Sequence, residues 1–213
     1  MQLLAASWYD LAKKTADSKK AFKHKMICSG IYMAGLLLCM AIGKHFSDIF
    51  GWLFFCGYIM LFLHDVLEEH RAKPTIIISD ASGALGYLLT ACALGVMNHS
   101  IFSSSVNKTH IDEIIALICA IVCVVICLAT REHIAKLIPT AFLLARAIIF
   151  GISLQNSGDA KMQAASCAMI MGTLAITTSV LLSVFDKKGA KSLIRINLYY
   201  FGLMFISCSV AVL

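Results

Sequence analysis

Charge is scarce in this sequence: only 14% of its 213 residues are Asp, Glu, Lys or Arg. A soluble globular domain carries about 25%. The hydrophobic share is 60% and the mean hydropathy is +0.84. Together these values exclude an ordinary soluble domain and predict a polytopic membrane protein.

Proline, polar linkers and familiar catalytic motifs are also scarce or absent. The sequence has two prolines, and its polar connections are too short for an extramembrane domain. It contains no GxSxG, HExxH, P-loop or dinucleotide-binding pattern, which excludes the enzyme classes built on those motifs. The strict alternation of membrane strands is missing as well, so we expect an all-α bundle.

All nine cysteines fall inside apolar runs. This placement argues against a disulfide framework and against a zinc site. Cys119, Cys123 and Cys127 do recur every four residues, and the alternative is a soft-metal site on that helical face. Reduced cysteine more often packs as a small apolar residue, so we expect no metal site and no cofactor.

Apolar runs of about 15 to 23 residues have the length that a helix needs to cross about 30 Å of hydrocarbon. They predict seven spans, which we place at about 26–43, 50–64, 75–97, 114–130, 137–154, 164–185 and 194–213. We predict that 1–25 is an amphipathic, basic segment at the membrane surface, because Leu4, Trp8 and Leu11 recur at helical spacing. The alternative is a solvated tail.

Lysine and arginine divide unevenly between the two sides that these spans define. Fourteen of the eighteen lie on one side and three on the other, with Arg146 inside a span. The basic side is expected to be cytoplasmic. The N-terminus is then cytoplasmic and the C-terminus lies on the opposite side. Topology thus accounts for the net charge of +6, and we expect no nucleic-acid partner.

Two acids stand at or inside the apolar runs. Asp65 closes the second run and Asp80 lies within the third. A carboxylate in hydrocarbon costs several kcal/mol unless it is paired, neutralised or hydrated. We therefore take both aspartates as candidate catalytic residues, with one of them activating water as a general base.

Other polar residues are expected at a similar depth, in the cytoplasmic half of the membrane. These candidates for binding a substrate headgroup are His64, Arg146, Thr178, Ser179, Tyr199 and Tyr200. Structural alternatives remain open for several of the site residues. Asp80 and Arg146 are equally suited to a helix-locking ion pair, Asp65 to a solvated helix end, and the tyrosines to interfacial anchoring.

Short patterns in a fixed order resemble the lysoplasmalogenase-like (YhhN) family of membrane proteins. A basic string precedes an apolar span at Phe22–Met40, and the second span ends in Leu63-His64-Asp65-Val66-Leu67. Ser82-Gly83-Ala84 opens the next span, and Leu198-Tyr199-Tyr200-Phe201-Gly202 lies in the last. This resemblance covers about residues 23–213.

The resemblance implies a multi-span enzyme that hydrolyses the vinyl ether bond of lysoplasmalogen, a lysolipid. Where the family carries Ser-Asp or Ser-Asn, this chain has Thr178-Ser179, so Asp65 is the retained acid and Asp80 is expected to supply the second. The expected setting is a bacterial inner membrane, with membrane lipid around the bundle. The alternative is a catalytically inactive relative or a small proton-coupled transporter.

Overall fold

The computed structural model describes residues 18–68, 73–102 and 137–185, together with 192–213. In these ranges the chain is helical throughout, apart from short turns. The elements, in chain order, are α2 (Ser18–Gly43), the short 3₁₀ helix η1 (His45–Ser47), α3 (Ile49–Glu68), α4 (Lys73–Phe102), α6 (Leu137–Gln155), α7 (Ala160–Phe185) and α8 (Ser192–Val212).

Six of these helices are long and apolar enough to cross a membrane. Their spanning parts run over Phe22–Gly43, Ile49–Glu68, Ile78–Ile101, Leu137–Gln155, Ala160–Ser183 and Leu193–Val212. At about 1.5 Å per residue, even the 19-residue α6 extends roughly 28 Å. The chain is therefore a multi-pass membrane protein, as the composition predicts.

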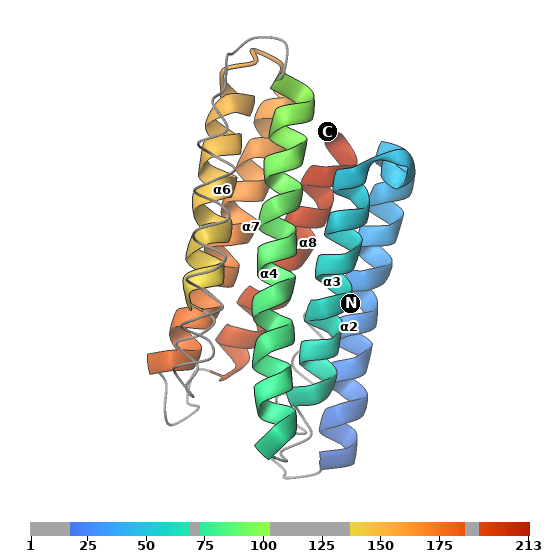
Figure 1. Ribbon diagram of the computed structural model, residues 1–213, viewed down its shortest axis with the longest axis vertical. Helices are drawn as coiled ribbons and strands as arrows, with labels where there is room; N and C mark the ends of the chain where they lie inside the picture. The colour runs from blue at the N-terminus through green and yellow to red at the C-terminus, as the bar shows by residue number, and fades with distance from the viewer. Residues whose placement is uncertain (1–17, 69–72, 103–136, 186–191) are drawn as a thin grey trace.

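The six long helices pack side by side as a ring (Figure 1). Each contacts its neighbour in the order α2, α3, α4, α6, α7 and α8, and α8 closes the ring against α2. Large apolar side chains such as Leu38, Ile49 and Ile152 point outward and are more than half exposed. An apolar exterior is what a bundle surrounded by lipid requires.

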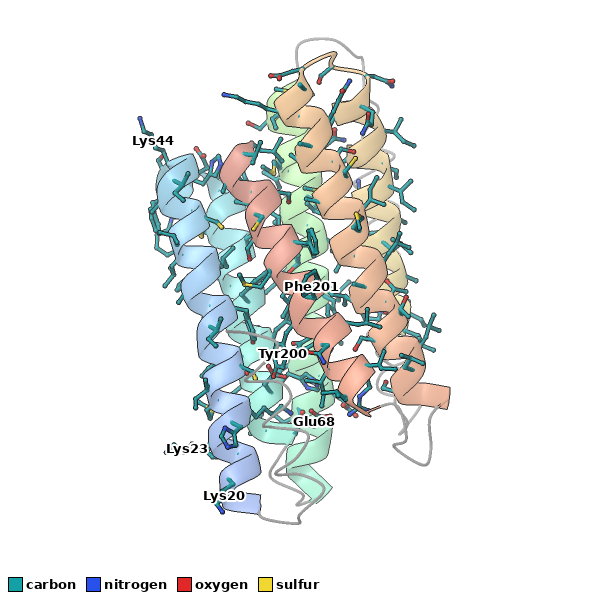
Figure 2. The ribbon with its side chains drawn as sticks, turned by 180° about the vertical axis from the view of Figure 1, so that it is seen from behind. Lys20, Lys23, Lys44, Glu68, Tyr200 and Phe201 are labelled. Atoms are coloured by element: carbon teal, nitrogen blue, oxygen red, sulfur yellow. The ribbon has the colours of Figure 1, made fainter. Side chains whose placement is uncertain are left out.

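Basic residues gather at one end of the bundle. Figure 2 shows Lys20, Lys23 and Glu68 toward this end and Lys44 at the other. We call it the basic end and define it by Lys20, Lys23, Lys25 and Arg195. The charge asymmetry expected from the sequence is therefore present among the described residues.

The helices extend beyond the predicted apolar spans at several ends. The predicted 50–64 and 75–97 become α3 and α4, and α2 begins at Ser18, so 18–25 is helix continuous with the first span. Charged residues continue a helix because their long stems cover apolar surface while their heads reach water. Asp65 is thus one turn inside α3, not at its end.

Two predictions lie outside the described residues. One is the span at 114–130, and the other is the amphipathic character of 1–17. Among the described helices, α4 ends and α6 begins at opposite ends of the bundle (Figure 1).

Close helix contacts at glycine hold two helix pairs together. Between α7 and α8, a Cβ built on Gly202 would lie 2.5 Å from the Gly172 carbonyl oxygen and 2.6 Å from Ile176 Cγ1. Between α3 and α4, a Cβ on Gly86 would lie 2.9 Å from the Gly57 carbonyl oxygen. Small residues allow such approach in membranes, where packing drives helix association.

We predict that Gly202→Ala destabilises the bundle by about 1–3 kcal/mol, because the added methyl group meets backbone that cannot yield. The matched control is Gly30→Ala in α2, where an added Cβ meets nothing within 4 Å. Thermal unfolding of the two purified variants in detergent measures the difference. Equal melting temperatures for the two variants would refute the close α7–α8 packing.

Candidate functional site

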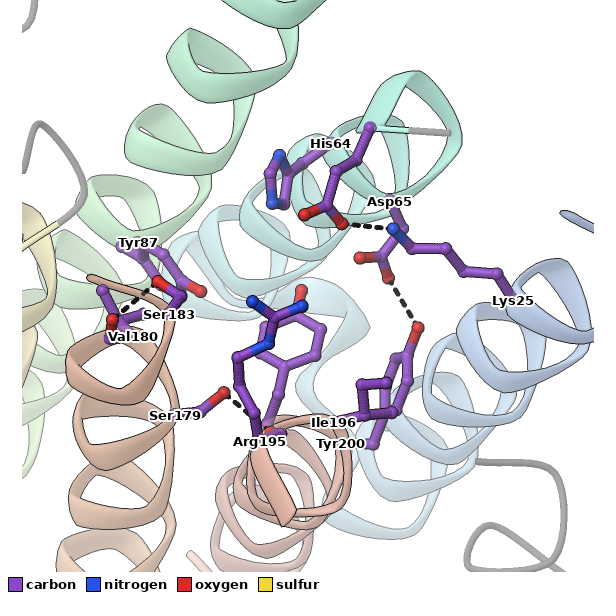
Figure 3. A pocket seen from close by; sticks show the side chains of 12 residues that line it. Lys25, His64, Asp65, Tyr87, Ser179, Val180, Ser183, Arg195, Ile196 and Tyr200 are labelled. Carbon is purple, nitrogen blue, oxygen red and sulfur yellow. Dashed lines mark hydrogen bonds and ion pairs between the residues drawn. The ribbon is translucent and has the colours of Figure 1, made fainter. Parts of the chain in front are cut away.

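A polar pocket lies between the helices near the basic end (Figure 3). It has about 650 Å³ of space outside its atoms, its open mouth included. Five helices line it, with Lys25 from α2, His64, Asp65 and Glu68 from α3, Tyr87 from α4, Ser179, Val180 and Ser183 from α7, and Arg195, Ile196, Tyr199 and Tyr200 from α8. Both acids and bases thus converge from separate parts of the chain.

Asp65 is the most deeply placed carboxylate of this pocket, and it is only 3% exposed. Its Oδ2 accepts hydrogen bonds from Ser29 at 2.7 Å, from Tyr200 at 3.3 Å and from Tyr32 at 3.4 Å. Oδ1 makes no hydrogen bond with a described residue. The hydroxyls therefore fix the carboxyl group through one oxygen and leave the other available to a ligand or a water molecule.

The two tyrosines that donate to Asp65 belong to an aromatic cluster that also contains Tyr58. Tyr32 stacks on Tyr200 and meets Tyr58 edge-on, both with ring centroids 5.8 Å apart. Tyr58 donates a hydrogen bond to the Leu203 carbonyl oxygen at 2.7 Å. The cluster is almost fully buried. It fills the interior between α2, α3 and α8 beyond Asp65.

His64 and Glu68 stand beside Asp65 on α3. His64 Nδ1 lies 2.8 Å from both the carbonyl oxygen and the hydroxyl of Ser79, which orients the ring. When Nδ1 donates its proton to the Ser79 carbonyl oxygen, Nε2 is the unprotonated ring nitrogen and can accept a proton. Glu68 forms an ion pair with Lys25, whose side chain is 4% exposed. This pair joins α2 to α3 at the pocket wall.

One potential ligand atom from each of His64, Asp65 and Glu68 lies within 4.8 Å of the other two. These residue types suit a divalent cation. The Lys25 ammonium group, however, already lies against Glu68. An incoming metal ion would be repelled by this ammonium group, so the carboxylates are arranged for a positively charged side chain.

The α8 side of the pocket carries different groups. Figure 3 shows the Arg195 side chain extending into the pocket opposite Asp65 and His64. Tyr199 follows one helical turn later, and its buried hydroxyl has no hydrogen-bond partner among the described residues. Ser179 on α7 donates to the Arg195 carbonyl oxygen at 2.8 Å, which ties the two helices together here.

The pocket brings together five of the residues singled out in the sequence, which are His64, Asp65, Ser179, Tyr199 and Tyr200. Asp80, Arg146 and Thr178 are not part of its lining. The Arg146 guanidinium group lies 5.5 Å from the Phe142 ring centroid on α6. The Thr178 hydroxyl donates to the Leu174 carbonyl oxygen within α7.

Rotation about the helix axis separates Asp80 from the pocket. Successive helical residues differ by about 100°. Ser79 points at His64, so its neighbour Asp80 points elsewhere and is partly exposed. The sequence indicates how deep in the membrane Asp80 lies, but it does not determine the direction in which the side chain points around the helix axis.

Sequence reasoning missed five polar residues of the lining, namely Lys25, Glu68, Tyr87, Ser183 and Arg195. Two spacings in the sequence could have indicated Glu68 and Arg195. Glu68 is three residues after Asp65, and Tyr199 is four after Arg195, and both spacings place side chains on one helical face. Lys25 was assigned to the surface segment, because its contact with Glu68 joins positions far apart in the chain.

Fold and site together define a multi-pass helical membrane protein with a polar pocket built around a buried aspartate. Comparisons of the chain with protein-family models, with curated proteins and with solved structures give no match.

We predict that Asp65→Ala destabilises the protein by about 1–3 kcal/mol, since it removes the acceptor for three buried hydroxyls. Asp65→Asn keeps an oxygen acceptor and the side-chain shape, so it serves as the matched control and is expected to unfold much closer to the wild-type temperature. Thermal unfolding in detergent compares the two. An alanine variant as stable as the asparagine variant would show that these hydrogen bonds contribute little.

Proposed function

We propose that this protein binds a single-chain lipid at its polar pocket and hydrolyses the lipid's vinyl ether bond. The observation that carries the proposal is Asp65, buried beside His64 and Glu68 with one carboxylate oxygen turned to the pocket. The resemblance to lysoplasmalogenase-like proteins points to the same residue. Buried carboxyl groups in a membrane pocket are by default candidates for function.

The position of the pocket suits a lysolipid. It lies near the basic end, and charged and hydroxyl side chains that could contact a headgroup line it. With the basic end cytoplasmic, the headgroup would enter from the inner leaflet, and we place the protein in a bacterial inner membrane with its N-terminus in the cytoplasm.

The reaction needs one proton donor and one activated water. Protonated Asp65 transfers its proton to the outer vinyl carbon, and the C=C electron pair forms the new C–H bond. The neighbouring carbon and the ether oxygen then share a positive charge, which the Asp65 carboxylate stabilises. Water adds to that carbon and loses a proton to a base. In the resulting hemiacetal the hydroxyl loses its proton to water and forms the C=O bond, while the C–O bond to glycerol breaks and the departing oxygen takes a proton from the protonated base. The products are a free aldehyde and the glycerol hydroxyl, and the proton released to water restores protonated Asp65.

His64 and Glu68 are the pocket residues suited to act as that base. The ring of His64 is oriented by Ser79, and this contact makes Nε2 the proton acceptor. Glu68 is held by Lys25. In this proposal they take the role that the sequence suggested for Asp80. General acid and base groups each contribute about 10²- to 10⁴-fold to such reactions.

A proton-coupled transporter is the rival function. Transport needs access from both ends of the bundle, whereas the buried Tyr32, Tyr58 and Tyr200 fill the interior beyond Asp65. This packing favours a pocket that opens at one end over a pathway across the membrane. A catalytically inactive relative would keep the pocket and bind lipid without releasing aldehyde.

We predict that purified wild-type protein releases free aldehyde from a lysoplasmalogen, and that Asp65→Asn lowers the rate by about 100-fold or more because the proton donor is lost. The matched control is Asp159→Asn in the exposed α6–α7 turn. Asn replaces Asp well as the residue capping a helix N-terminus, so we expect an unchanged rate. Aldehyde is measured with a coupled dehydrogenase assay.

Two results would contradict the proposed hydrolase. The first is the absence of aldehyde release by the folded wild-type protein, and the second is full activity in the Asp65→Asn variant. The Asp80→Asn variant tests whether the reaction depends on Asp65 alone or on both aspartates. A rate near wild type is expected for this variant, since Asp80 is not part of the pocket lining.

A further inference from the structure

Two hydrogen-bond donors on the α8 side of the pocket are not used by the fold. Arg195 and Tyr199 are four residues apart and both line the pocket. The Arg195 guanidinium group makes no ion pair or hydrogen bond with a described residue. The Tyr199 hydroxyl is buried and lacks a partner there as well. A buried hydroxyl without a partner is unusual in a folded protein and calls for an acceptor, whereas the partly exposed Arg195 can be hydrated when no ligand is bound.

Three other polar side chains of the lining have partners among the described residues, namely Lys25, Ser179 and Ser183. Lys25, the second cation of the lining, pairs with Glu68. The Ser179 hydroxyl donates to the Arg195 carbonyl oxygen, and the Ser183 hydroxyl donates to the Val180 carbonyl oxygen. The spare positive charge of the described pocket wall is therefore concentrated at Arg195.

We propose that Arg195 and Tyr199 form an anion-binding subsite that takes the phosphate group of a lysophospholipid. Arginine presents a planar fork of donors that matches phosphate oxygens, and a phenol adds a single directed hydrogen bond. Tyr87 on α4 lines the same pocket, and its hydroxyl has no hydrogen bond with a described residue. A tetrahedral phosphate has enough oxygens to accept from all three.

The position in the bundle favours a lipid phosphate as the ligand. Arg195 lies in the first turn of α8, about 5 Å along the axis from the helix start. This is the basic end of the bundle, where the phosphates of a leaflet lie and where the helix N-terminus adds a positive partial charge. Free inorganic phosphate presents the same chemistry and is distinguished by experiment.

This subsite assigns different tasks to the two pocket walls. Arg195 and Tyr199 would hold the phosphate. Asp65 and His64 face Arg195 across the cavity (Figure 3), and Glu68 belongs to the same lining. The glycerol and the bond to its chain are then presented to the carboxylates. Arg195 is a binding residue in this arrangement and takes no part in proton transfer.

The inference rests on the proposed function only in taking the ligand to be a lysolipid. Its test is therefore binding without turnover. The probes are a saturated alkylglycerol phosphate, which has no vinyl ether to hydrolyse, and the matching alkylglycerol without phosphate. Calorimetric titration in detergent measures the affinity of the wild type and of four variants, namely Arg195→Gln, Arg195→Lys, Tyr199→Phe and Arg146→Gln.

We expect Arg195→Gln to weaken binding of the phosphate lipid by about 10- to 100-fold, and Tyr199→Phe by about 2- to 10-fold. Arg195→Lys keeps the charge without the fork and should fall between Arg195→Gln and the wild type. Binding of the alkylglycerol should change by less than about 2-fold in each. Arg146→Gln is the matched control, because Arg146 lies outside the pocket lining, and it should bind both lipids normally.

Equal losses for both lipids in folded Arg195→Gln and Tyr199→Phe variants would overturn the subsite. Loss of phosphate preference in Arg146→Gln would overturn it too. Tyr199→Phe remains informative if Arg195→Gln fails to fold, since no described hydrogen bond is lost with the hydroxyl. If inorganic phosphate displaces the phosphate lipid at the lipid's own concentration, the ligand is free phosphate and the lipid assignment is wrong.

The same samples separate this inference from the hydrolase. Phosphate binding that depends on Arg195, in a protein that releases no aldehyde, would leave the subsite standing and remove the proposed reaction. Aldehyde release by a protein that binds both lipids equally would leave the proposed reaction standing and remove the subsite.

Discussion

Burying the Asp65 carboxyl group between three helices is the constraint on which the arrangement of this bundle depends. A carboxyl group at this position is tolerated only with polar partners. α2 supplies Ser29 and Tyr32, and α8 supplies Tyr200. Because these partners come from helices far apart in the chain, satisfying one side chain fixes how α2, α3 and α8 meet.

The charged side chains near Asp65 differ between the two walls of the pocket. Lys25 and Glu68 neutralise each other where α2 meets α3. Arg195 on the facing wall keeps its charge for the pocket. The site is thus divided into a wall with the Asp65 and Glu68 carboxyl groups and a wall with the Arg195 and Tyr199 donors. In the proposed function, the headgroup of the lysolipid lies between these walls.

The fold class and most helices could be predicted from the sequence, because hydrocarbon imposes length and composition on every span. The helix ends could not, since Lys25 and Glu68 continue helices past the apolar runs. For the site, the sequence identified Asp65 by its depth. Depth alone could not separate Asp65 from Asp80 or Arg195 from Arg146, because rotation about each helix axis and contacts between distant segments decide which side chains face the pocket.

An experimental structure of the protein with the saturated alkylglycerol phosphate bound is the most direct test of the central claim. We expect the phosphate to contact Arg195 and the Tyr199 hydroxyl, with the alkyl ether oxygen on the Asp65 side of the pocket and Oδ2 still held by Ser29. A lipid bound only on the outer apolar faces, with Asp65 enclosed by dry side-chain packing, would contradict it.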